Sequence, residues 1–121
     1  MSAARDKFER RAEAARSLLC VGLDPEFERI PERFKNEEWP LFAFNRWIIE
    51  QTHLYAASYK PNMAFYEARG TQGLRELELT IEYLRGEHPD LSARLTRDSC
   101  PDSCPKDRLP VYFLSAVRKS G

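Results

Sequence analysis

The sequence lacks any apolar run long enough to cross a membrane. Its apolar segment at residues 18–23 (LLCVGL) is short beside the roughly 18 apolar residues that a spanning helix needs. Residues 1–16 carry charges of both signs and contain no apolar stretch of the kind found in signal peptides. These absences argue against a membrane or secreted protein, and we expect a cytoplasmic one.

An excess of either charge is also missing. Lysine and arginine together number 19, aspartate and glutamate together number 19, and the formal net charge is zero. A chain without net positive charge has no bulk attraction to nucleic acid or to an anionic membrane surface. We therefore expect neither of these as a partner.

Cysteine and histidine are scarce, with three and two copies. An odd number of cysteines in a chain without a signal peptide argues against a disulfide framework. Cys100 and Cys104 have a C-x3-C spacing, but zinc sites often use two such pairs. His53 falls in a predicted helix and His88 in a predicted turn. We expect no metal site, and two free cysteines in a loop.

Apolar spacing predicts strands that alternate with helices. Residues 18–23 (LLCVGL) and 56–60 (AASYK) have the composition of short buried strands, each stopped by a proline. Helices are predicted at residues 5–17, 41–56 and 71–85, with one helical turn inside 62–69 and Gly86 as a stop signal. Such alternation is typical of βαβ units and of a parallel sheet.

The helix at 41–56 and the segment before it carry further expectations. Phe44, Trp47 and Tyr55 share one helical stripe, which we expect to face the core. Residues 26–40, with prolines at both 31 and 40, are expected to be irregular.

Composition changes after Asp90. Residues 91–108 contain Arg, Asp, Ser, Cys and Pro without helical or strand period, and we predict a loop or a disordered segment there. Residues 109–114 (LPVYFL) are apolar and predict a further short strand. We therefore divide the chain into residues 1–90 and an irregular tail at 91–121.

Two ionisable residues stand where predicted strands end. Asp24 follows the first strand and Lys60 closes the second, and in parallel α/β folds functional residues gather at these ends. Neighbouring strands lie about 4.8 Å apart, so a carboxylate and an ammonium there can pair or hold one ligand. Alternatively, Asp24 only caps the turn before Pro25 and Lys60 is solvated. Position alone favours this second interpretation.

Four strings resemble consecutive stretches of orotidine-5′-phosphate decarboxylase, in its longer bacterial branch. They are LCVGLDP, FNRWIIEQT, SYKPNMAFYEARGTQGL and TIEYLRGEHPD, in order across residues 18–90. The resemblance implies a (β/α)₈ barrel that works as a homodimer without metal or organic cofactor. It implies conversion of orotidine 5′-monophosphate to UMP and carbon dioxide, in de novo pyrimidine biosynthesis. It assigns Asp24 to the ribose and Lys60 to the charged network that also contacts the ribose, and it gives Asn62 no separate role.

The family also carries an Asp-x-Lys-x-x-Asp string at the end of its third strand, and the 121 residues contain no such string. Laid over LPVYFLSAVRKSG, the three motif positions fall on Ser115, Val117 and Ser120. Either the tail is out-of-frame sequence, or residues 91–108 are an insertion before a degenerate third strand. We favour the first explanation.

The chain is thus expected to be α/β, with the first two to three βα units of a TIM barrel. A single-chain barrel takes about 250 residues, twice the length available here. We expect this chain to be inactive although its family is enzymatic. The alternative is a non-catalytic remnant that binds a partner chain. Unpaired strand edges further predict self-association or aggregation.

Overall fold

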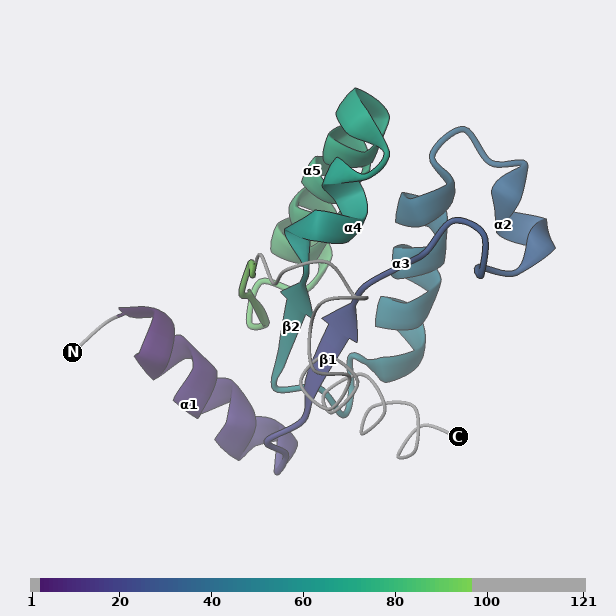
Figure 1. The fold of residues 1–121 in the computed structure, drawn as a ribbon. Helices are drawn as coiled ribbons and strands as arrows, with labels where there is room; N and C mark the ends of the chain where they lie inside the picture. The colour runs from purple at the N-terminus through teal and green to yellow at the C-terminus, as the bar shows by residue number, and fades with distance from the viewer. Residues whose placement is uncertain (1–2, 97–121) are drawn as a thin grey trace, which may run out of the picture.

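The computed structural model describes residues 3–96 and contains a parallel sheet flanked by helices (Figure 1). The sheet has the order β1-β2-β3, and β2 pairs in parallel with both neighbours. The strands are β1 (Cys20–Leu23), β2 (Ser58–Pro61) and β3 (Ser92–Ala93). The helices are α1 (Ala3–Ala15), α2 (Glu32–Lys35), α3 (Pro40–Thr52), α4 (Met63–Glu67) and α5 (Gly70–Glu87). The predicted alternation of parallel strands and helices is confirmed.

The main core lies between one face of the sheet and the helices. Val21 and Tyr59 are partners in the β1–β2 register, and both are buried with Leu23 on the helical side. They pack with Ile49 of α3 and Leu84 of α5. Because successive strand residues point to opposite faces, Gly22 and its register partner Lys60 face the other side of the sheet.

A second core lies beyond the carboxyl ends of the strands. α5 packs against both α3 and α4, and Figure 1 shows α4 and α5 side by side. The buried residues of this second cluster are Ile30, Leu41, Tyr66 and Leu77. The predicted site residues lie at this end of the sheet, Asp24 just after β1 and Lys60 within β2.

The buried face of α3 differs from the predicted stripe. Trp47 is 38% exposed and Tyr55, beyond the helix end, is 60% exposed. Asn45 and Thr52 are buried instead, and the Asn45 Nδ2 and the Thr52 hydroxyl form hydrogen bonds inside the protein. The stripe prediction is therefore wrong for Trp47 and Tyr55, whereas Phe44 packs against the second core as expected.

Several predicted boundaries also need correction. The segment at 26–40 contains the short helix α2. Gly86 does not stop α5, which continues to Glu87 because one glycine in a helix is tolerated. The third strand described is Ser92–Ala93, inside the segment predicted as a loop, and an isolated bridge joins Asn62 to Thr96.

Some predictions fall outside the described residues, namely the strand at 109–114, the cysteine pair and the positions laid over the family motif. Within residues 3–96, no helix is long and apolar enough to cross a membrane.

Candidate functional site

Asp24 and Lys60 lie at the same end of adjacent parallel strands. Lys60 is in register with Gly22, and Leu23, which precedes Asp24, is in register with Pro61. Both ionisable side chains are half-buried. The predicted placement on neighbouring strand ends is therefore confirmed, whereas the approach of their charged atoms to within about 6 Å stays a prediction.

Asn62 directly follows β2 at the same carboxyl end of the sheet, and no role was predicted for it from the sequence. It is 1% exposed, and its Oδ1 accepts a hydrogen bond from the backbone N–H of Ala64 at 3.1 Å, which caps α4. Its Nδ2 is buried and has no hydrogen-bond partner within residues 3–96. Leaving a buried donor unsatisfied costs about 1–3 kcal/mol. An amide held this way at a strand end can donate to a ligand.

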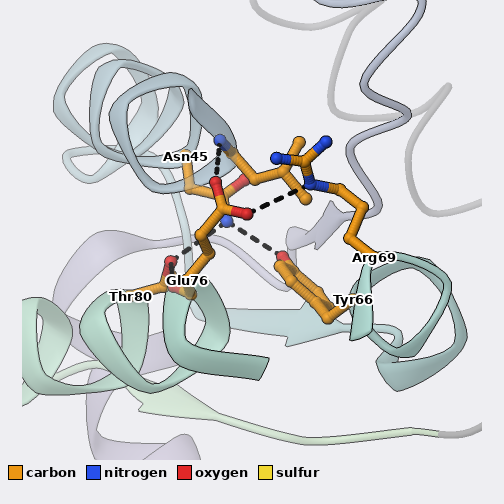
Figure 2. A network of polar contacts seen from close by, with 6 residues as sticks. Asn45, Tyr66, Arg69, Glu76 and Thr80 are labelled. Carbon is orange, nitrogen blue, oxygen red and sulfur yellow. Dashed lines mark hydrogen bonds and ion pairs between the residues drawn. The ribbon is translucent and has the colours of Figure 1, made fainter. Parts of the chain in front are cut away.

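A network of buried polar groups is hydrogen-bonded to the carboxyl end of β1 (Figure 2). The Tyr66 hydroxyl donates to the backbone carbonyl of Leu23 at 2.8 Å. Asn45 Nδ2 donates to the Tyr66 hydroxyl at 2.9 Å and to Thr80 Oγ1 at 3.1 Å. The Thr80 hydroxyl donates in turn to the backbone carbonyl of Glu76 at 2.8 Å. Tyr66 thus links the last residue of β1 to polar side chains of α3 and α5.

The ionisation of Tyr66 fits this role as a donor. Burial raises the pKa of its hydroxyl far above the ordinary value of 10. The hydrogen bond from Asn45 opposes this rise in the pKa, while the charges of Asp24 and Glu76 add to it. The hydroxyl is therefore protonated at any physiological pH and keeps its proton for the Leu23 carbonyl.

Glu76 carries a buried carboxylate in the same region (Figure 2). It accepts from the backbone N–H of Leu41 at 2.5 Å and from Arg69 Nε at 3.2 Å. The donor, Leu41, lies in the first turn of α3, where the negative charge of the Glu76 carboxylate interacts favourably with the helix dipole. The Arg69 guanidinium also stacks on the ring of Phe27, 4.4 Å from its centroid, in the loop after β1. The pair therefore joins α5, α3 and this loop.

The two histidines meet at the opposite end of the sheet. The rings of His53 and His88 lie 4.5 Å apart, between their centroids. Among residues 3–96 no group of three or more potential ligands is placed to hold a metal ion. Their juxtaposition was not foreseen from the sequence, because each histidine follows a different helix.

The chain resembles known proteins in sequence and in fold, although no family model matches it. The chain is 53% identical over 75 residues to orotidine 5′-phosphate decarboxylase of Christiangramia forsetii, an alignment that covers 62% of this chain and 28% of the relative. The chain is 44% identical over 87 residues to orotidine 5′-phosphate decarboxylase of Leptospira interrogans. This alignment covers 72% of this chain and 32% of the relative.

A solved structure of Leishmania donovani OMP decarboxylase is also similar. It is 39% identical with a TM-score of 0.57, and the match covers 74% of this chain and 31% of that one. The resemblance found in the strings of residues 18–90 is confirmed, and so is the fold as part of a TIM barrel. The chain spans between a quarter and a third of the length of the curated relatives that it matches.

Proposed function

We propose that residues 18–90 form the ribose-binding part of an orotidine 5′-phosphate decarboxylase active site, with Asp24 and Lys60 as the residues that contact the ribose. The main support for this proposal is the parallel pairing of β1 with β2, which brings both residues to the carboxyl end of the sheet. The similarity to orotidine 5′-phosphate decarboxylases supports the identity of the ligand, orotidine 5′-monophosphate.

The chemistry of a ribose fits these side chains. Its two hydroxyls each need a hydrogen-bond acceptor or donor in a fixed position, and rigid strand ends provide such positions. The Asp24 carboxylate accepts a hydroxyl proton, and the Lys60 ammonium donates to a hydroxyl oxygen. The amide of Asn62 supplies a second donor nearby. Contacts of this kind, remote from the reacting carbon, contribute binding energy that enzymes use to reach the transition state.

Decarboxylation requires further groups beside the reacting carbon. Loss of carbon dioxide leaves an electron pair on the ring carbon, which needs a nearby cation and a proton. In the family, the lysine of the Asp-x-Lys-x-x-Asp string provides both, and that string does not occur in the 121 residues. Removing a preorganised charge of this kind lowers the rate by about 10²–10³-fold or more. We therefore propose that the 121-residue chain binds nucleotide without converting it.

A second candidate function is binding of a partner chain. Three large apolar side chains are exposed just before β1 and β2: Leu18 at 80%, Leu54 at 67% and Tyr55 at 60%. Leu18 precedes β1, an outer strand of the sheet within residues 3–96, and exposed apolar groups beside an outer strand favour self-association. Sedimentation of the purified chain tests this function, and a compact monomer at all concentrations would contradict it.

Nucleotide binding tests the first candidate. Titration of the 121-residue chain with UMP, followed by calorimetry, is expected to show binding that Asp24→Asn and Lys60→Ala each weaken by roughly tenfold. Asp90→Asn and Lys7→Ala, which change matched charges far from this edge, are the controls. Absence of binding, or equal weakening by the controls, would refute the ribose assignment.

Turnover is tested separately. Incubation with orotidine 5′-monophosphate, followed by the loss of substrate absorbance, is expected to show no conversion. Lys60→Ala serves as the check for contaminating host enzyme. Turnover that Lys60→Ala abolishes would mean that other residues replace the missing string.

A further inference from the structure

We infer that Tyr66 is a positioning residue for the candidate ribose site: its hydroxyl fixes the end of β1 and thereby the backbone that carries Asp24. Asn45 and Thr80 fix the direction in which that hydroxyl donates. This inference rests on the proposed function, because it assigns a supporting residue to the same site.

The end of β1 receives a hydrogen bond from outside the sheet. Leu23 is the last residue of β1. Its backbone carbonyl accepts a hydrogen bond from the buried Tyr66 hydroxyl of α4 at 2.8 Å. This carbonyl belongs to the peptide unit that leads directly into Asp24. Because a peptide unit is planar, holding its oxygen limits the backbone rotation that aims the Asp24 side chain.

The donor and the acceptor of each hydrogen bond in the network can be identified from the chemistry of the partner groups. The Tyr66 and Thr80 hydroxyls each donate to a backbone carbonyl, which cannot donate in return. Their oxygens can therefore only accept from Asn45, and the group that bridges them must be its amide NH₂. Asn45 Oδ1 is left buried with no hydrogen-bond partner within residues 3–96. The amide thus has one workable orientation, and the tyrosine has one direction in which to donate.

The network is also rigid, because its parts come from different elements and are buried. Asn45, Tyr66 and Thr80 are each 0% exposed, and they lie on α3, α4 and α5. Water therefore cannot replace the Tyr66 hydroxyl as a donor without a rearrangement of three helices. A site that must hold a carboxylate in a defined orientation benefits from supporting groups of this kind.

A purely structural hydroxyl would affect stability alone, so the test measures selectivity for the ribose. The full 121-residue chain is titrated with UMP and with 2′,3′-dideoxyuridine 5′-monophosphate, which lacks the hydroxyls that Asp24 and Lys60 are proposed to contact. In the wild type, UMP is expected to bind more tightly. Tyr66→Phe keeps the ring and removes only the hydroxyl, and it is expected to lower the ratio of the two affinities by roughly tenfold.

Tyr59→Phe is the matched control. The Tyr59 hydroxyl is also fully buried, and it bonds Thr52 at 2.7 Å in the main core rather than at the end of β1. This substitution is expected to lower stability and to leave the affinity ratio unchanged. Thermal unfolding of each variant identifies the temperature at which all of them are folded.

The outcomes separate the two proposals. A wild type that binds neither nucleotide, or both equally, overturns the ribose site and this inference with it. A ratio that Tyr66→Phe leaves intact, or that Tyr59→Phe lowers equally, overturns the positioning role alone. If Tyr66→Phe does not fold, Thr80→Val takes its place, since it removes the far acceptor of Asn45. An unchanged ratio in that variant then overturns the inference.

Discussion

At the carboxyl ends of β1 and β2 most of the supporting polar side chains are fully buried, whereas at the amino ends they are partly exposed. Asn45, Tyr66, Glu76 and Thr80 are each 0% exposed, and Arg69, which donates to Glu76, is 21% exposed. At the amino ends, Arg11 of α1 donates to the carbonyls of His53 and Ala56 and to Asp90, whose side chain is 61% exposed. The two ends of one sheet thus depend on different kinds of interaction.

The difference has consequences for energy and for function. A hydrogen bond to a group that water can reach is partly replaced by water when it is lost, whereas a buried group that loses its partner stays unsatisfied. Substitutions at the carboxyl end should therefore be more destabilising than those at the amino end. The end that must hold a ligand is the one whose supporting groups water cannot replace.

The largest expected effect comes from Glu76→Ala. It leaves the Arg69 guanidinium and the Leu41 N–H without their buried acceptor, and breaking such a pair costs about 3–5 kcal/mol. Urea unfolding followed by circular dichroism measures the loss. Glu78→Ala, on the same helix but paired with Arg75 at the surface, is the control and should change stability by less than about 1 kcal/mol. Equal effects of the two substitutions would contradict the claim that a buried carboxylate contributes more to stability than an exposed one.

Gly73→Ala should be the next most destabilising change. A Cβ at this position would lie 2.0 Å from the backbone oxygen of Tyr66, so α4 and α5 would have to separate. Overpacking of this kind costs about 1–3 kcal/mol. Because α4 carries Tyr66, the nucleotide affinity should fall together with stability.

Gly86→Ala is the matched control for that substitution. Among residues 3–96, apart from the neighbouring residues and backbone of α5 itself, no atom lies within 4 Å of the Cβ position at Gly86, which is inside α5. Alanine favours a helix over glycine by about 0.5–1 kcal/mol, so this change should raise the melting temperature. Changes of the same sign at the two glycines would show that the contact between α4 and α5 is looser than described.

Arg11→Ala tests the amino end and should have a moderate effect. It removes three hydrogen bonds, but water can reach their partners in part, and we expect a loss of about 1–2 kcal/mol. Arg10→Ala, an exposed neighbour on α1, is the control. Thermal unfolding measures both variants, and added salt should reduce the difference between them, because the contact with Asp90 is an exposed ion pair. A loss as large as that in Glu76→Ala would contradict the comparison.

Much of the fold could be predicted from the sequence, because short apolar runs alternate with helical patterns. The strand at Cys20–Leu23 falls inside its predicted range, and Lys60, predicted as the last residue of the next strand, lies one residue before its end at Pro61. The parallel pairing then brings Asp24 and Lys60 to one edge, as the order of elements requires.

The supporting network could not be predicted. Its members come from three helices, and a buried glutamate such as Glu76 is unexpected from hydropathy, since charged residues are seldom buried without a partner. The sequence predicts a helical turn inside residues 62–69, but it does not show which carbonyl the Tyr66 hydroxyl meets. The strand at Ser92–Ala93 is too short for its pattern to be read, and its pairing depends on β2.

The smallest effect expected concerns pH and the histidine pair at the amino end. Burial lowers the pKa of His88 below its ordinary value of 6.5, and the neighbouring His53 lowers it further. Asp90 and Glu87 act in the opposite direction, and Arg11 adds to the lowering. On the far side, Tyr83 packs its ring edge against His88 and donates its hydroxyl to Glu50 at 2.9 Å.

The sign of the pH effect follows from the lowered pKa. Between pH 6.5 and the folded-state pKa of His88, the unfolded chain binds more protons, so stability falls as the pH is lowered through this range. His88→Phe keeps a ring to pack against His53 but cannot titrate, and its free energy of unfolding should fall less between pH 7.5 and 5.5. Because His88 is only half-buried, this difference should be smaller than the effects above. Urea unfolding at both pH values measures it, and an equal fall in the two proteins would mean that the pH response at this end belongs to other groups.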